Sequence, residues 1–187
     1  MSQRRALIIV AALAALTMSG ASNWLIDAAF FPWAHADPPL LDSWTGRLTA
    51  GNGDRLDLVL VLRRRVDSDG TVCTNCNQIE GTAVTCDARG TVRRYRVAGS
   101  PRDRQGHQLH IGAVPEPLID GLELDTLSGT WDGADTLALK ANFFWRRGKA
   151  GISSTDDPAT QPVPVLLRRQ APANASAHRE SPAPACA

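Results

Sequence analysis

The sequence has almost no excess charge and few aromatic residues. Its 187 residues carry a formal net charge of +1, and aromatic residues make up 5% of them. A balance this close to neutrality removes the usual electrostatic argument for a nucleic-acid-binding protein, so we expect no nucleic-acid partner. So low an aromatic content suits a small core better than a surface on which bases stack.

The common catalytic and cofactor-binding motifs are also missing. The sequence contains no G-x-S-x-G, no phosphate-binding glycine loop and no H-E-x-x-H. His107 and His110 are three residues apart on an expected strand, where that spacing places side chains on opposite faces. We therefore predict no catalytic residue, no cofactor and no metal site, and we expect that the protein is not an enzyme.

Lysine is scarce: the chain has two lysines and 18 arginines. The clusters Arg63–Arg65 and Arg93–Arg94 lie on expected strands. Neighbouring residues on a strand point to opposite faces, so neither cluster makes one coherent basic patch. We interpret both as part of a solvated sheet face rather than as a phosphate site.

No charged residue occurs between Ala6 and Ile26, and Arg4 and Arg5 come just before this stretch. A basic start followed by an apolar run is the pattern of an export signal. An amphipathic helix does not fit, because the run has no polar face. We interpret residues 1–36 as a signal peptide or a signal-anchor helix of a bacterial protein, with the residues from Asp37 onward outside the inner membrane.

Two fates of this hydrophobic helix remain open. If it is not cleaved, residues 6–26 are long enough to span a bilayer, and Trp24 and Trp33 are expected at the outer interface. If it is cleaved, the small residues of Ala34–Ala36 or of Ser19–Ala21 offer cleavage sites, and the product is secreted or periplasmic. We favour the uncleaved anchor, with the membrane as a partner through residues 6–26.

The middle of the chain has the period-two alternation of half-buried strands. The pattern is clearest from Arg55 to Arg63 and from Thr136 to Trp145, where apolar residues occupy every second position. It predicts a core that includes Leu56, Leu58, Leu60, Leu62, Leu137, Leu139 and Phe143. Turn clusters separate the strands, among them Asp87–Gly90, which fits a type I turn.

About eight to ten such strands, with no helical period after the leader, predict an all-β antiparallel barrel or sandwich. Trp44 and Trp131 each begin a W-x-G element that precedes L-x-L. This repeat suggests that first and late strands meet to close a barrel. Pro162 and Pro164 mark the last strand as an edge. We assign residues 37–169 to the β domain and residues 170–187 to a disordered tail.

The only group of residues in the sequence that suggests a specific chemical role is the four cysteines, Cys73, Cys76, Cys86 and Cys186. An even number in an exported protein indicates disulfide bonds first. Two alternatives are a redox pair at Cys73 and Cys76, and a zinc site that adds Cys86 and one histidine. The surroundings do not resemble the helix start of a redox pair, and no second C-x-x-C completes a zinc site.

The distance between the cysteines along the chain favours one set of disulfide bonds. If residues 77–86 form a single strand, Cys76 and Cys86 lie about 30 Å apart at about 3.3 Å per residue, whereas a disulfide needs Cα atoms within about 7 Å. This leaves Cys73–Cys76 and Cys86–Cys186. A hairpin at Gly81 would instead bring Cys86 toward Cys76.

These observations predict an exported, membrane-tethered envelope β-barrel module that binds an apolar ligand or a protein partner. Two other functions remain open. One is a structural accessory subunit of an envelope complex, and the other is a thiol- or metal-dependent enzyme centred on Cys73 and Cys76.

Overall fold

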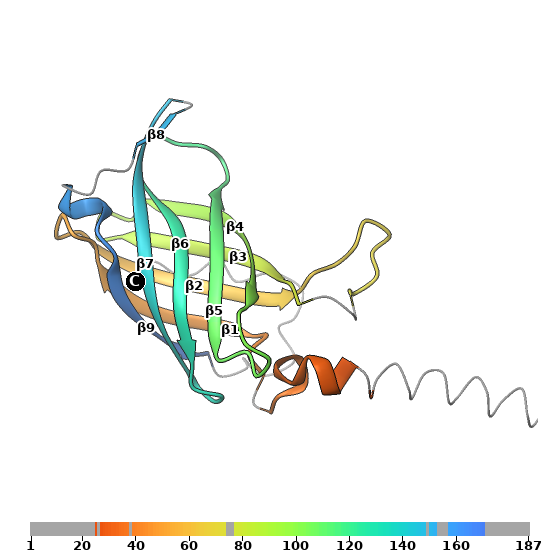
Figure 1. Cartoon of the computed structure of the whole chain (residues 1–187). Coiled ribbons are helices and arrows are strands. Elements are labelled where there is room, and N and C mark those ends of the chain that lie inside the picture. Colours follow the sequence, from red (N-terminus) through yellow and green to blue (C-terminus); the bar gives the residue numbers. More distant parts are fainter. Residues whose placement is uncertain are drawn as a thin grey trace, which may run out of the picture.

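The computed structural model describes residues 25, 27–37, 39–73, 77–148, 150–152 and 157–170 (Figure 1). This part of the chain contains nine strands: β1 Ser43–Thr49, β2 Arg55–Arg64, β3 Ile79–Asp87, β4 Val92–Pro101, β5 Gln108–Pro115, β6 Gly121–Trp131, β7 Thr136–Arg147, β8 Ala150–Ile152 and β9 Val163–Arg169. It also contains two short 3-10 helices, η1 Pro32–His35 and η2 Pro158–Thr160.

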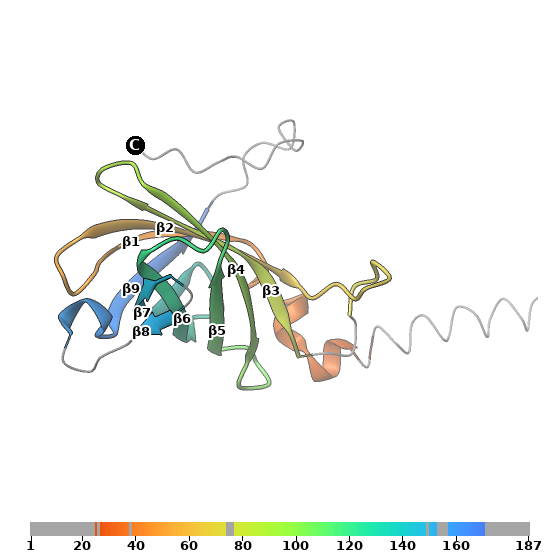
Figure 2. The same ribbon diagram turned by 90° about the horizontal axis from the view of Figure 1, so that it is seen from above.

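The strands close into a barrel. Each strand from β1 to β7 pairs antiparallel with the next, and β9 lies between β7 and β1. Eight strands therefore form the ring, while the short β8 extends the end of β7 (Figures 1 and 2). The all-β antiparallel prediction is confirmed, and of its two architectures the chain adopts the barrel.

The ring closes where the first and last strands meet. Trp44 to Arg47 of β1 pair with Arg169 to Leu166 of β9. The repeated tryptophan element predicted contact between first and late strands, and β1 does meet a late strand. It does not meet β7, the strand after Trp131, because β9 lies between them.

The expectation that the last strand is an edge is wrong, because β9 has a partner on each side. The prolines are tolerated for a local reason. Pro164 pairs with Lys140 of β7, but β1 pairs with β9 only from Leu166 onward. Pro164 therefore lies in the half of β9 with one ladder, where its missing N–H breaks no hydrogen bond.

The predicted core fills the barrel. Leu58, Leu60 and Leu137 are completely buried, Leu62, Leu139 and Phe143 are nearly so, and Leu56 packs against them partly buried. Each buried leucine contributes about 1.5–3 kcal/mol. Trp145 lies beyond the stretch of β7 that pairs with β9, and it is 36% exposed.

The turn predicted at Asp87–Gly90 joins β3 to β4. The backbone N–H of Gly90 donates to the carbonyl of Asp87 over 3.0 Å, and the Asp87 carboxylate accepts from the N–H of Arg89 and of Thr91. Gly81 lies inside β3, paired with Leu62 and Val97, so there is no hairpin at this position.

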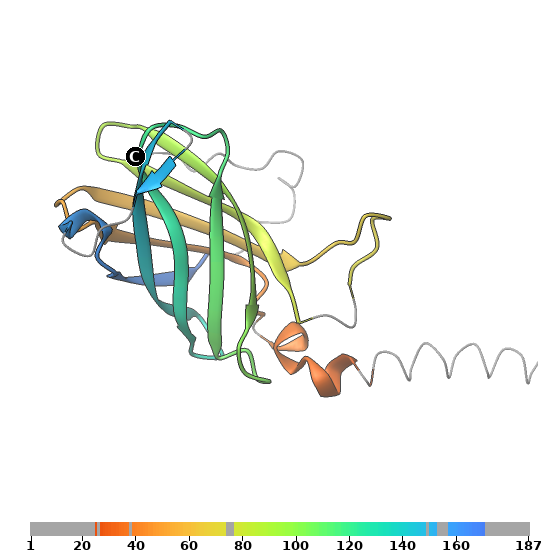
Figure 3. The same ribbon diagram turned by 45° about the horizontal axis from the view of Figure 1, so that its top comes forward.

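Residues 27–42 pack against one end of the barrel, which we call the near end (Figure 3). Trp33 of η1 and Leu40 belong to the barrel core, with 1% and 0% of their surfaces exposed. A Cβ added to Gly106 would lie 2.3 Å from the Cβ of Trp33, so this glycine leaves room for the tryptophan. The opposite end, at the β3–β4 turn and the β5–β6 loop, is the far end.

The packing at the near end corrects an expectation about the residues at the start of the chain. Trp33, expected at a membrane interface, is instead a core residue of the barrel, so residues before the predicted boundary at residue 36 contribute to the core. Of the segment 1–36 predicted as a signal peptide or signal-anchor helix, the apolar run at residues 6–26 lies outside the described residues except for Leu25. None of the helices in the described part is long and apolar enough to cross a membrane. Residues 171–187 of the predicted tail also lie outside it.

Candidate functional site

The barrel wall opens at the far end between β5 and β6. These strands pair only from Gln108–Gly112 on β5 to Thr126–Thr130 on β6. Ala113 to Pro115 continue to pair with β4 alone, and the register of β6 shifts between Leu124 and Thr126. The two strands therefore separate before the loop that joins them, and side chains from β4 reach into the space between them.

A hollow of about 360 Å³ lies at this opening. It is lined by the start of β4, the β5–β6 loop and the start of β6, through Val92, Arg93, Arg94, Glu116, Pro117, Ile119 and Glu123. Ligand sites in proteins occupy about 300–1,000 Å³, so this hollow is of a size to hold a small molecule.

A buried ion pair forms the base of the hollow. Nη1 of Arg93 donates to Oε1 of Glu123 over 2.6 Å, and Nη2 of Arg93 donates to the carbonyl oxygen of Asp120. The side chain of Glu123 is 1% exposed and that of Arg93 is 21% exposed. The second carboxylate oxygen, Oε2 of Glu123, is buried and has no hydrogen-bond donor at close range among the described residues, although the Tyr95 hydroxyl also interacts with this carboxylate.

Tyr95 supports this pair from inside the barrel. Its hydroxyl accepts the backbone N–H of Leu124 over 3.3 Å and lies 3.5 Å from the hydroxyl of Thr85. Burial raises the pKa of Tyr95 to about 12, and the negative charge of Glu123 acts in the same direction. Tyr95 therefore keeps its proton at physiological pH and presents a neutral hydroxyl beside the carboxylate.

Exposed apolar and charged side chains together line the hollow. Val92 and Ile119 line it and are 41% and 44% exposed, and the neighbouring Leu118 is 59% exposed. Glu116 also lines the hollow, and it forms an ion pair with Arg96 over 3.3 Å. Exposed apolar side chains grouped around a hollow are typical of binding sites rather than of ordinary protein surface.

The near end holds a different arginine–carboxylate pair. Arg64 donates two hydrogen bonds to Asp27, over 2.7 and 2.8 Å, and His35 Nε2 lies 2.8 Å from the same carboxylate. The Arg64 guanidinium lies 5.9 Å from the ring of Phe31 and 5.8 Å from that of Trp33. Burial alone would raise the pKa of Asp27, but the hydrogen bonds and charges of Arg64 and His35 outweigh it and hold this pKa below 3.8.

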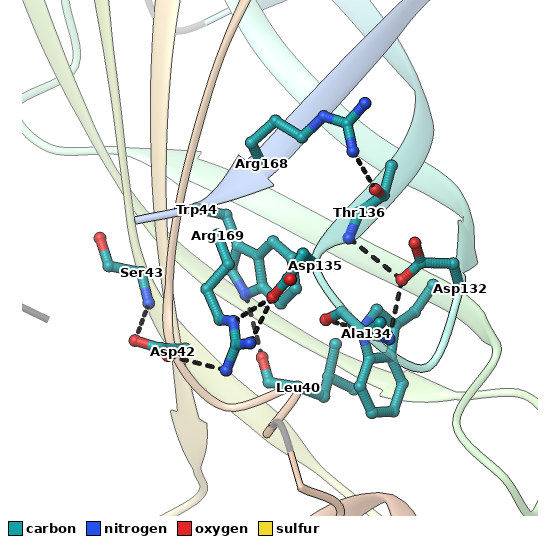
Figure 4. Close-up of polar contacts among 11 residues, drawn as sticks. Leu40, Asp42, Ser43, Trp44, Asp132, Ala134, Asp135, Thr136, Arg168 and Arg169 are labelled. Carbon is teal, nitrogen blue, oxygen red and sulfur yellow. Dashed lines mark hydrogen bonds and ion pairs between the residues drawn. The ribbon is translucent and has the colours of Figure 1, made fainter. Parts of the chain in front are cut away.

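Polar contacts also fasten the seam between β1 and β9 at the near end (Figure 4). Arg169 forms an ion pair with Asp135 of the β6–β7 turn, and a longer one of 3.9 Å with Asp42. The indole N–H of Trp44 donates to the carbonyl of Leu40 over 3.0 Å. These contacts tie the closing strands to residues 27–42, which is a structural role.

Cys73 and Cys86, the two cysteines among the described residues, do not line the hollow. Cys73 and Cys86 are both disulfide-bonded. The N–H of Cys73 binds the carbonyl of Arg65, whereas Cys86 pairs with Asp57, eight residues earlier along β2. That spacing is about 26 Å, too far for these two cysteines to bond to each other. The predicted pairing with Cys76 and Cys186 stays a prediction, because both lie outside the described residues.

The arginine clusters are only partly solvated. Arg63 is exposed and pairs with Glu80, while Arg64 is buried against Asp27, which agrees with alternation along a strand. The prediction of a solvated face is wrong for Arg64 and Arg93, because each neutralises a buried carboxylate. Among the described residues, no group of three or more histidine, cysteine or acidic side chains is placed to hold a metal ion.

Comparison with known proteins places the chain in no family. No family model matches it. Over 74 residues, 40% of this chain, it is 31% identical to transcription initiation factor IIB of Schizosaccharomyces pombe, and it spans 21% of the length of that protein. A solved structure of a de novo designed fluorescence-activating β barrel is similar over 77% of this chain and 98% of its own, with a TM-score of 0.43 and 14% identity.

Sequence reasoning missed Glu123 as a site residue. Alternation from Gly121 to Asp125 places Glu123 and Asp125 together on a polar face. Asp125 is exposed, but Glu123 is buried because Arg93 reaches across the opening between β5 and β6. This opening depends on where two strands stop pairing, and no local pattern in the sequence marks that point.

Proposed function

We propose that this protein is an exported, membrane-tethered module of the bacterial envelope, in which the β-barrel binds a ligand or a protein partner. Its tether is the uncharged stretch of residues 6–26, retained after export, with the barrel on the outer side of the inner membrane. The observation that carries the proposal is the position of residues 27–42 in the barrel.

Cleavage at the later of the two candidate sites, Ala34–Ala36, would remove residues that pack in the barrel. A cut after Ala36 would delete Asp27, the partner of Arg64, and Trp33, which packs in the core. The barrel would then keep a buried arginine without its carboxylate and a cavity of tryptophan size, and each change costs several kcal/mol. A chain that stays intact to Asp27 avoids both costs.

The same position supports a binding role for the far end. Residues 27–42 directly follow the proposed tether and close the near end, so the near end faces the membrane. The hollow at the far end then points away from the bilayer, toward soluble ligands or partners. Two of its charged groups are neutralised, because Arg93 pairs with Glu123 and Glu116 pairs with Arg96, which leaves Arg94 as a basic side chain in the lining.

Export and tethering are tested on the full chain expressed in bacteria. A phosphatase reporter fused after Arg169 is expected to be active only outside the cytoplasm, and the protein is expected in the membrane fraction. Intact-mass analysis is expected to find a chain that begins at Met1, with no cut at Ser19–Ala21 or at Ala34–Ala36. A matched control, R4E with R5E, is expected to reduce export, because it removes the basic residues that precede the apolar run.

Two results would contradict the proposal. Activity of the reporter only in the cytoplasm would exclude export. A mature chain that begins at Asp37 would show that the barrel folds without Asp27 and Trp33, and it would remove the tether.

A further inference from the structure

We propose that the segment after β9 crosses the outer face of β1, β2 and β3 and is fixed there by a disulfide bond between Cys186 and Cys86. We call residues 171–185 the strap. It runs from Gln170 at the near end to Cys86 at the far end and covers a row of apolar side chains on the outside of the barrel. The inference goes beyond the proposed binding role and rests only on the proposed export, because disulfide bonds form outside the cytoplasm.

The partner of Cys86 follows by elimination. Cys73 and Cys86 are both disulfide-bonded but lie too far apart to bond to each other, so each bonds to one of the two other cysteines of the chain, Cys76 and Cys186. The structure shows that Cys86 lies on β3, in a strand that continues without a turn from Ile79 to Asp87. The position of Cys86 on this strand decides between the two partners.

Cys76 cannot reach Cys86. Ile79 precedes Cys86 by seven residues of β3, which is about 23 Å at about 3.3 Å per residue. Cys76 precedes Ile79 by three residues, so their Cα atoms are at most about 11 Å apart at about 3.8 Å per residue. At least about 12 Å therefore separates Cys76 from Cys86, and a disulfide bond allows about 7 Å. This leaves Cys73 with Cys76, and Cys86 with Cys186.

The burial of Cys86 is an independent observation. Its neighbour Thr85 points into the barrel, where its hydroxyl lies 3.5 Å from that of Tyr95, so Cys86 points outward. The ladder neighbours of Cys86 on this outer face are open to solvent, with 43% of the Asp57 side chain and 41% of Val92 exposed. Cys86 lies between them and is only 6% exposed. A covalent partner on the outside of the barrel accounts for this burial.

The strap begins close enough to Cys86. The N–H of Gln170 donates to the carbonyl of Ser43, so the chain leaves the barrel beside β1. Ser43 and Cys86 are four positions apart along the ladders of β1, β2 and β3. Three strand spacings of about 4.8 Å and four residues of about 3.3 Å give a path of about 20 Å. The 16 residues from Gln170 to Cys186 reach about 53 Å when extended, so they span this path easily.

Apolar side chains lie under this path. Thr45, Val59 and Val84 are ladder neighbours across β1, β2 and β3 on the outer face, and Val61 beside them is 40% exposed. Covering such side chains removes apolar surface from water, which is favourable. Residues 181–185 of the strap are serine, alanine and proline only, and their small side chains let a chain lie close to a sheet. The two prolines also favour an extended chain.

The proposed bond locks the closure of the barrel. β9 completes the ring between β7 and β1, and the strap ties the chain that follows β9 to β3 across β1 and β2. The bond closes a loop of about 100 residues, and the stabilisation by a disulfide increases with loop length. In its formation the two thiols lose two protons and two electrons, and an oxidising protein disulfide of the envelope accepts them by thiol–disulfide exchange.

Peptide mapping without reduction tests the pairing on the full chain in lipid nanodiscs. Trypsin, combined with a protease that cuts after glutamate, separates three peptides: residues 66–80 with Cys73 and Cys76, residues 81–89 with Cys86, and residues 181–187 with Cys186. We expect peptide 81–89 to be linked to peptide 181–187. A link between peptides 66–80 and 81–89, or a free thiol at Cys86, would overturn the proposal. The chain is first treated with oxidised glutathione, so the outcome does not depend on export.

Substitution of the bonded cysteines measures the effect of the strap on stability. We expect Cys186→Ser to lower Tm by about 10 °C, as the opening of so long a loop predicts. Cys86→Ser and the double variant are expected to lose about the same amount, because all three break one bond. Cys73→Ser with Cys76→Ser is the control, since it opens a loop of about four residues, and it is expected to lose less than half as much. Additive losses from Cys86→Ser and Cys186→Ser would show that these residues do not share a bond.

Methyl NMR locates the strap. In Cys186→Ser the methyl signals of Val59, Val61 and Val84 are expected to shift, because the strap leaves this face. Val114 is the control, since it lies on β5, is 52% exposed and is expected to keep its signal. Unchanged signals at all three valines would exclude the strap from this face. The peptide map needs no variant, so it decides the pairing even if a variant does not fold.

Discussion

The two ends of the barrel each bury an arginine–carboxylate pair, but they complete it differently. At the near end, Arg64 binds both oxygens of Asp27, and His35 adds a third contact. At the far end, Arg93 binds one oxygen of Glu123, and the hydroxyl of Tyr95 also interacts with this carboxylate. Arginine therefore binds both carboxylate oxygens at the near end but only one at the far end, which lies beside a hollow.

The difference comes from what covers each end. Residues 27–42 lie across the near end and bring Asp27 together with Phe31, Trp33 and Leu40. The far end is covered by connections between strands, among them the β8–β9 connection with η2, and the β5–β6 loop leaves β5 and β6 apart. A separate segment can fill the end of a barrel, whereas the loop between separated strands leaves space in which a ligand can bind.

The largest effect on stability is expected from removing a core side chain at the near end. Trp33→Ala removes a side chain that is 1% exposed, and we expect it to lower the free energy of unfolding by about 3–5 kcal/mol. Phe30→Ala is the control, because Phe30 is 63% exposed, and it is expected to cost less than about 1 kcal/mol. Urea unfolding of the full chain in nanodiscs measures both. Equal losses would mean that the near end is not packed as described.

A loss of about 3 kcal/mol is expected from Asp27→Asn, because Arg64 then stays buried without a carboxylate. The comparison variant is Asp57→Asn, which removes the carboxylate of an exposed pair with Arg47 and is expected to cost at most about 1 kcal/mol. Denaturant midpoints of the two variants check this difference. Similar midpoints would show that residues 27–42 do not depend on the ion pair.

An increase in stability is expected from a double substitution at the far end. The double variant Arg93→Met with Glu123→Leu replaces a buried, incompletely bonded ion pair by apolar side chains, and we expect it to raise stability by about 1–2 kcal/mol. Glu123→Leu alone is expected to lower stability, since it leaves Arg93 without its carboxylate. Thermal unfolding of the two variants separates these outcomes. A destabilised double variant would make the far-end pair structural, like the near-end pair.

The smallest effect is the expected change in stability at acidic pH. The pKa of Asp27 in the folded protein lies below 3.8, so its ion pair stabilises the fold fully above that value. This contribution is lost as the pH falls through the lowered pKa, because the protonated carboxyl no longer pairs with Arg64. We expect the stability difference between the unmodified protein and Asp27→Asn to shrink below pH 3.8. Denaturant melts across this pH range measure it, and a constant difference at all pH values would exclude the ion pair as its source.

Local pattern predicted much of the barrel and little of the candidate site. In β2 and β7 the leucines alternate with polar residues, and alternation needs only the pleat of the strand to place them inward. The Asp87–Gly90 turn was also readable, because an aspartate and a glycine at those positions favour it locally. Glu123 and Arg93 show the opposite case, since each is buried by contact with a residue 30 positions away.

By itself, the sequence determined the β class, the inward leucines and the main turns, because each depends on neighbours within a few residues along the chain. Only the tertiary structure decided that β9 lies between β1 and β7, that Trp33 and Asp27 close the near end, and that Glu123 is buried at an opening in the wall. These features depend on which distant segments meet when the sheet curves into a ring, and curvature and closure are properties of all eight strands together.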